Sequence, residues 1–256
     1  MDSSSSNEQD VPHPDIQVRQ RRQALVIAVG LAAPIVGLDY AGPILQSSHP
    51  GGFVWWHVLQ AALLVMLIVS HACGPILARG VLAIRHMRPD ADLLWGLALL
   101  IGLGAGTAHI VTGVAGSPYF GETAVVIVML NASRFVAARW ELAAMADSPA
   151  AVLIVGGVAA LAALGHSIGG LPDWTPRARA AMAVLLTAWP RELSLAKPHN
   201  SATPRGDSRP NASLSALYHA LVLPLAALGL MPPAWSAAVS LLTVMMVSAR
   251  RSRLAL

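Results

Sequence analysis

The chain has 256 residues, of which 55% are hydrophobic and only 12% are charged, and its mean hydropathy is +0.59. Soluble domains carry about 25% charged residues, so this composition predicts an all-α polytopic integral membrane protein without a separate globular domain. The excess of 17 Lys and Arg over 13 Asp and Glu is typical of a membrane topology signal and does not indicate nucleic-acid binding. The single Cys73 excludes an internal disulfide and a paired-cysteine metal site.

Residues 1–21 form a polar N-terminal segment that is Ser-rich at first and then basic. We expect this segment to be disordered and cytoplasmic. A signal peptide would carry its positive charges nearer the start and end in a small-residue cleavage site. The apolar run from Ala24 onward therefore predicts a retained first helix.

A membrane-spanning helix needs about 20 mainly apolar residues. Eight stretches meet this requirement and make residues 22–250 an expected eight-helix transmembrane domain. The stretches are approximately 22–46, 53–79, 92–114, 119–144, 149–171, 177–198, 214–231 and 233–250. A short cytoplasmic linker at 199–213 joins the sixth stretch to the seventh, and a basic tail follows at 251–256.

The basic residues predict the orientation of these helices. With both termini in the cytoplasm, all of the 17 Lys and Arg except Arg177 and Arg179 fall on the cytoplasmic side or near it. Positive charges favour cytoplasmic loops, so we expect this orientation, in a bacterial inner (plasma) membrane. In the second stretch, Gly74-Pro75 predicts a kink that lays the amphipathic segment 77–86 along the membrane surface.

The sixth stretch meets a proline and two charges at Trp189-Pro190-Arg191-Glu192. A proline breaks a helix, and charges at membrane depth usually mark a functional site. Two interpretations are open. Arg191 and Glu192 sense or gate an ion together, or Arg191 is a tethered cation that fills a site where an ion no longer binds. The second interpretation is favoured, because a guanidinium keeps its charge and repels a cation.

Several motifs, in order and spacing, resemble the membrane domain of heavy-metal P-type ATPases, especially the copper type. They are Gly74-Pro75, Asp92-Leu93-Leu94, Tyr119-Phe120, Ser133-Arg134-Phe135, Met145-Ala146-Asp147, the run from Leu193 to Pro198, Tyr218-His219 and the run from Leu223 to Ala227. The resemblance covers most of the chain after residue 20. It implies eight spanning helices with both termini cytoplasmic.

The chain departs from that family where the chemistry lies. No Asp is followed by Lys, so the phosphorylated Asp-Lys-Thr-Gly-Thr motif of the family is missing. The stretches 141–148 and 199–213 are too short for the family's actuator, phosphorylation and nucleotide-binding domains. We therefore expect no ATPase activity and no cofactor.

The ion ligands of the family are also replaced. Trp189 and Arg191 stand where two thiolates flank the proline in the copper family. Asp147, His219 and Thr243 are the weak candidates left for binding a metal, and none is expected to form a complete site. The resemblance therefore implies that the ion path is lost.

These features lead to three functional hypotheses. The first is a catalytically inactive structural or accessory subunit that binds another integral membrane protein, because topology and packing are kept while the chemistry is not. The second is residual transport of a copper-like cation, either passive or driven by a separately encoded ATPase domain. The third is a remnant without a biochemical role.

Overall fold

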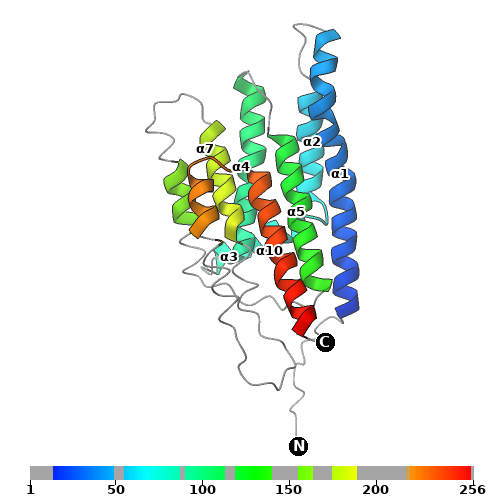
Figure 1. Cartoon of the computed structure of the whole chain (residues 1–256). Helices are drawn as coiled ribbons and strands as arrows, with labels where there is room; N and C mark the ends of the chain where they lie inside the picture. Colours follow the sequence, from blue (N-terminus) through cyan, green and yellow to red (C-terminus); the bar gives the residue numbers. More distant parts are fainter. Residues whose placement is uncertain are drawn as a thin grey trace, which may run out of the picture.

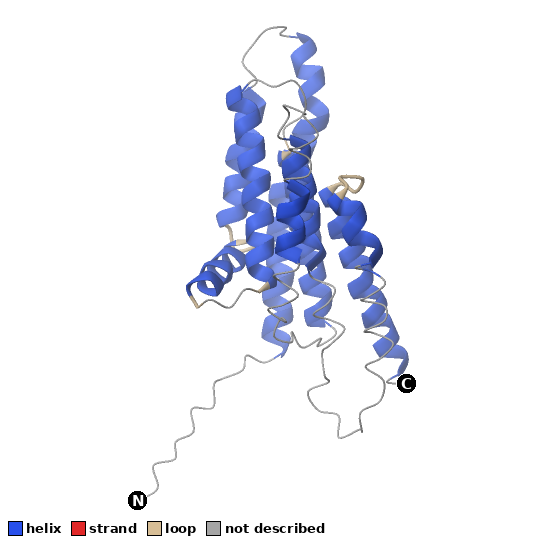
Figure 2. Cartoon of the chain, turned by 90° about the vertical axis from the view of Figure 1, so that its left-hand side faces the viewer, coloured by secondary structure: helices blue, strands red, loops and turns tan. Residues whose placement is uncertain are grey.

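The computed structural model describes residues 14–48, 55–86, 90–112, 119–139, 155–163, 175–188, 218 and 220–254. Within these ranges every regular element is a helix, which confirms the all-α prediction (Figure 2). The helices are α1 (Pro14–Ser48), α2 (Trp55–Val69), α3 (Gly74–Arg85), α4 (Ala91–Thr112), α5 (Phe120–Arg139), α7 (Thr175–Leu185), the 3-10 helix η1 (Leu186–Ala188) and α10 (Pro233–Leu254). Residues 155–163 and 220–227 are also helical.

α1 begins at Pro14, upstream of the boundary expected at residue 22, so residues 14–21 are helical rather than disordered. Pro14 stands at the first helical position, where its missing N–H removes no hydrogen bond, and Asp15 follows in the first turn. These two start signals extend the helix through the basic stretch. At the other end of the chain, α10 continues to Leu254, so most of the expected tail is helical as well.

The break between α2 and α3 confirms the predicted kink at Gly74-Pro75. α2 ends at Val69 and α3 begins at Gly74, and the two helices are bent by 66°. The Ser70 carbonyl accepts the N–H groups of Cys73 (3.2 Å) and Gly74 (2.8 Å), which closes a tight turn. The predicted stretch 53–79 is therefore divided into two helices, because Pro75 starts a new helix.

Small residues bring the long helices together. Phe120 packs on Gly106, and Thr123 packs on Gly102, so that a Cβ on either glycine would overlap these side chains of α5. α1 packs along α5, and its buried side carries three alanines spaced one turn apart, Ala24, Ala28 and Ala32. Small residues thus let α5 pack closely against both α1 and α4, which lie beside it in the bundle (Figure 1), while larger apolar side chains fill the rest of the core.

Three helices are long and apolar enough to cross a membrane, at Asp15–Gly42, Ala91–Thr112 and Phe120–Arg139. The bent pair of α2 and α3 raises the number to four if it counts as one span. These are the helices of an integral membrane protein. The sequence predicts eight spans, and much of the remaining predicted stretches, like the linker 199–213, lies outside the described residues.

The arginines gather at one end of the bundle. α1 begins and α10 ends at this end, and α3 lies there as well (Figure 1). Its described arginines are Arg19, Arg21 and Arg22 of α1, Arg79 and Arg85 of α3, Arg134 and Arg139 of α5, and Arg250, Arg251 and Arg253 of α10. Arg177 and Arg179 lie at the opposite end, where Arg179 reaches Glu122 in the first turn of α5 (3.5 Å). We call these the arginine-rich end and the opposite end.

Candidate functional site

Most residues of the predicted ion site lie outside the described part of the chain. These are Asp147, Trp189, Pro190, Arg191, Glu192 and His219. Among the described residues, Gly74 and Pro75 form the bend between α2 and α3. Thr243 is 8% exposed, and its hydroxyl donates to the Val239 carbonyl of its own helix (2.9 Å). This hydrogen bond turns Thr243 back onto α10.

The end of α7 lies against α10. α7 changes to the 3-10 helix η1 at Leu186, and the described helix ends at Ala188. The last carbonyls of a helix have no donor within that helix. The buried Ser240 hydroxyl of α10 lies 3.2 Å from the Leu186 carbonyl and 2.9 Å from the Ser236 carbonyl, so its one proton is available to either. A neighbouring helix thus places a donor beside the end of α7.

A small group of hydroxyls surrounds this contact. Tyr218 and Ser240 lie 3.0 Å apart through their hydroxyls, and Ser240 also contacts the Ser236 carbonyl (2.9 Å). Thr187 of η1 donates to the Val184 carbonyl (2.8 Å). All of these side chains are buried and neutral. Thiolates and carboxylates, the usual ligands of copper and zinc, are missing from this group.

A charged cluster lies inside the arginine-rich end, around the Asp92 carboxylate of α4. Its Oδ1 accepts a hydrogen bond from the buried Arg134 of α5, and its Oδ2 lies 3.3 Å from Nη1 of Arg79 in α3. Arg134 also stacks over the Trp95 ring, 4.9 Å from its centroid. Arg21 of α1 lies within electrostatic range of the same charges. One carboxylate thus joins α3, α4 and α5, and the cluster keeps an excess of positive charge.

A second carboxylate lies near the opposite end, on α1. Asp39 Oδ1 accepts a hydrogen bond from Gln60 Nε2 of α2 (2.7 Å), and the same amide nitrogen donates to the Ile35 carbonyl (2.8 Å). Asp39 Oδ2 lies against Gly121 of α5 so closely that a Cβ there would overlap it. Gln60 is fully buried, and its Oε1 has no partner among the described residues.

Two histidines lie near that second carboxylate. The rings of His57, one turn before Gln60 on α2, and His109 of α4 are 6.3 Å apart in an edge-to-face arrangement. Within the described ranges, no three His, Cys, Asp or Glu side chains come together as a metal site. The arrangement can hold charges and connect helices, and it offers no nucleophile, base and substrate cavity in one place.

Sequence reasoning missed Asp39, Gln60 and Ser240. The signal for Asp39 was present, because it is the one acidic residue within the first predicted stretch, 22–46. Asp92 and Arg134 were noted only as motif residues. Their opposite charges lie on two predicted helices that follow one another in the chain, which favours an ion pair between them. Ser240 gave no signal, because its role depends on the distant Leu186 carbonyl.

Comparison of the chain with known protein families, with curated proteins and with solved structures finds no match. The likeness to heavy-metal P-type ATPases therefore rests on the sequence motifs alone.

Proposed function

We propose that this chain is a membrane protein without enzymatic activity that serves as a structural or accessory subunit of a membrane protein complex. The eight-span, heavy-metal ATPase-like arrangement in a bacterial inner membrane, with both termini cytoplasmic, belongs to the same proposal. The bend at Gly74-Pro75 supports the likeness. The gathering of arginines at one end supports the orientation.

The observation that carries this proposal is the outward face of α1. Gly30, Ala33 and Gly37 are exposed there, and a Cβ on either glycine would meet no atom of the chain within 4 Å. A helical glycine costs about 1 kcal/mol relative to alanine, and no contact inside the described chain requires these two. Small residues at such spacings let membrane helices approach closely. The face therefore fits an apolar helix of another protein.

Pro34 lies on the same exposed face and leaves a backbone carbonyl of α1 in need of a hydrogen-bond donor. Because proline has no N–H, the Gly30 carbonyl lacks the donor that a regular helix would supply. In a bilayer, a neighbouring helix can satisfy such a group. We therefore expect the partner helix to carry a hydroxyl, as Ser240 does for Leu186 within this chain.

The absence of pumping is supported by the neutral hydroxyls at the end of α7. Ser240 lies 3.2 Å from the Leu186 carbonyl there, and its hydroxyl neighbours Tyr218 and Thr187 are poor ligands for copper or zinc. Residual cation transport through Asp147, His219 and Thr243 is the competing function. Proteoliposomes loaded with a copper-sensitive dye test it directly, and copper flux that is lost in Asp147→Ala would contradict the proposal.

The partner is tested by photocrosslinking from position 33 in native membranes, followed by purification in mild detergent. We expect a cross-link to a different membrane protein that is lost in Gly37→Leu and kept in Gly104→Leu. Gly104 is the matched control, because it is an exposed glycine of α4 that also has open space at its Cβ. Both variants should fold as well as the wild type, since a Cβ at either position has no atom of the described chain within 4 Å.

Two results would contradict the proposal. One is a chain that purifies as a monomer with no cross-link from position 33. The other is a cross-link only to a second copy of this chain, which would assign the face to self-association.

A further inference from the structure

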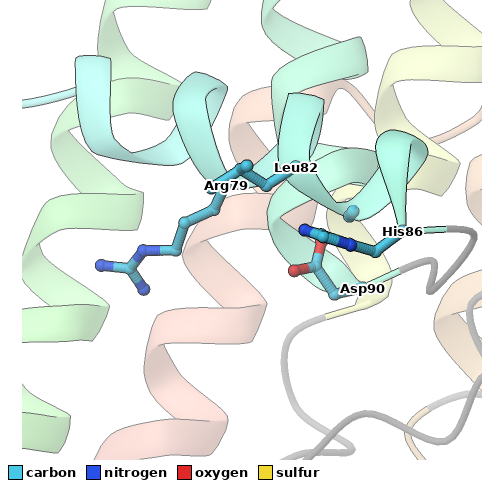
Figure 3. Close-up of a pocket in the computed structure, with 5 residues that line it drawn as sticks. Arg79, Leu82, His86 and Asp90 are labelled. Atoms are coloured by element: carbon cyan, nitrogen blue, oxygen red, sulfur yellow. The ribbon is translucent and has the colours of Figure 1, made fainter.

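A cavity of about 560 Å³ lies beside α3 at the arginine-rich end. Its lining is Arg79, Leu82, Ala83 and His86 of α3 together with Asp90, just before α4. Figure 3 shows the Asp90 carboxylate beside the His86 ring, while the long Arg79 side chain extends from α3 away from these two groups. The cavity thus combines a fixed cation, an imidazole and apolar side chains.

The α3 helix is held where it can meet lipid headgroups. Gly80 lies against the start of α4, and a Cβ there would lie 3.2 Å from the Cα of Leu93. The helix buries Ile76, Gly80 and Ala83 against the bundle, while its exposed apolar side chains are Val81, Leu82 and Ile84. An amphipathic helix that turns away from a spanning helix by 66° is the geometry of an interfacial segment.

The charge around the cavity favours an anion. Arg79 is half-exposed, and Arg85 of the same helix is exposed. Asp92 is already shared by Arg79 and Arg134, with Arg21 in electrostatic range, so it does not neutralise this end. Basic pockets among membrane helices on the cytoplasmic side are typical binding sites for anionic lipid headgroups.

We propose that this cavity binds the phosphate headgroup of an anionic phospholipid. Arg79 and His86 donate hydrogen bonds to the phosphate oxygens, and the acyl chains follow the exposed apolar residues of α3. Asp90 is the one acidic lining residue, and its Oδ1 accepts the Leu93 N–H (2.8 Å) as the cap of α4. Its charge opposes the phosphate and limits the affinity. This inference is independent of the proposed subunit role.

Native mass spectrometry of the purified full chain, titrated with phosphatidylglycerol or phosphatidylcholine, tests the proposal. We expect preferential retention of phosphatidylglycerol, weakened about fivefold in Arg79→Gln, the effect of one arginine at an anionic surface. Arg179→Gln is the matched control and should bind as the wild type does. Arg179 is 43% exposed and 3.5 Å from Glu122 at the opposite end, while Arg79 is 49% exposed and 3.3 Å from Asp92.

Two further variants keep the test decisive if Arg79→Gln fails to fold. His86→Ala removes an exposed side chain and should also weaken binding. Asp90→Asn keeps a good helix cap and should strengthen binding by removing the opposing charge. Equal retention of the two lipids, or equal losses in the variants of Arg79 and Arg179, would overturn the proposal. Displacement of the lipid by inorganic phosphate at equal concentration would overturn it as well.

Discussion

Two carboxylates of this bundle are stabilised in opposite ways. Asp92, at the arginine-rich end, is held by charges, because Arg134 and Arg79 bind its two oxygens from α5 and α3. Asp39, near the opposite end, is held by an amide and by shape, since Gln60 donates to one oxygen and Gly121 makes room for the other. Asp92 therefore depends on cations, while Asp39 depends on a residue without a side chain.

The positions of the two groups explain the difference. Arginines gather near the cytoplasmic surface that we propose for the first end, where the half-exposed Arg79 keeps its charged head within reach of water. Asp39 instead lies against the first turn of α5, where the helix dipole favours a negative charge. Three predictions test this contrast, in order of decreasing effect.

Replacement of the main cation is expected to have the largest effect. Arg134→Met should lower the free energy of unfolding by about 3–5 kcal/mol, because it leaves Asp92, which is only 12% exposed, with Arg79 as its half-exposed partner. Steric trapping in detergent measures this quantity. Arg79→Met, on the other oxygen of the same carboxylate, should cost only about 0–1 kcal/mol, because Arg79 is half-exposed. Similar losses of unfolding free energy in both variants would show that the burial of Arg134 does not make its ion pair stronger than that of Arg79.

A methyl group at Gly121 tests the shape around Asp39. Gly121→Ala should lower the free energy of unfolding by about 1–3 kcal/mol, since the new Cβ displaces Asp39 Oδ2 and strains the hydrogen bond to Gln60. The loss should nearly vanish in an Asp39→Ala background. A double-mutant cycle measured by steric trapping checks this coupling. Additive effects would mean that the two residues do not meet in the membrane.

Removal of the amide should have the smallest effect. Gln60→Leu loses the hydrogen bonds to Asp39 and Ile35 but also removes the buried Oε1, so we expect a loss of about 1–2 kcal/mol in the free energy of unfolding. Gln23→Leu on the exposed side of α1 is the control and should change it by less than about 0.5 kcal/mol. Equal changes in unfolding free energy for the two replacements would mean that the hydrogen bond from Gln60 to Asp39 does not stabilise the fold.

The sequence alone predicted the helical class, the approximate ranges of α4 and α5, and the break at Gly74-Pro75. These features depend on hydrophobic runs and on local backbone chemistry, which are readable from neighbouring residues. The start of α1 was placed too late, because the polarity of residues 14–21 outweighed the start signals of Pro14 and Asp15.

The polar contacts were less predictable, for a physical reason. The pairs Asp39 with Gln60, Asp92 with Arg134, and Ser240 with Leu186 each join residues that are far apart in the chain. Their formation depends on which faces the helices turn toward one another. From the sequence alone, Gly121 is an ordinary glycine at the start of a helix. Its role depends on Asp39, which contacts it only in the folded chain.

The hydrogen bond from Ser240 to the Leu186 carbonyl has a consequence for biogenesis. The two residues are 54 positions apart, so the Leu186 carbonyl is synthesised before the α10 hydroxyl that lies beside it. During that interval, water has to solvate the carbonyl. The surroundings of the end of α7 are therefore complete only once α10 has been synthesised and has packed against it.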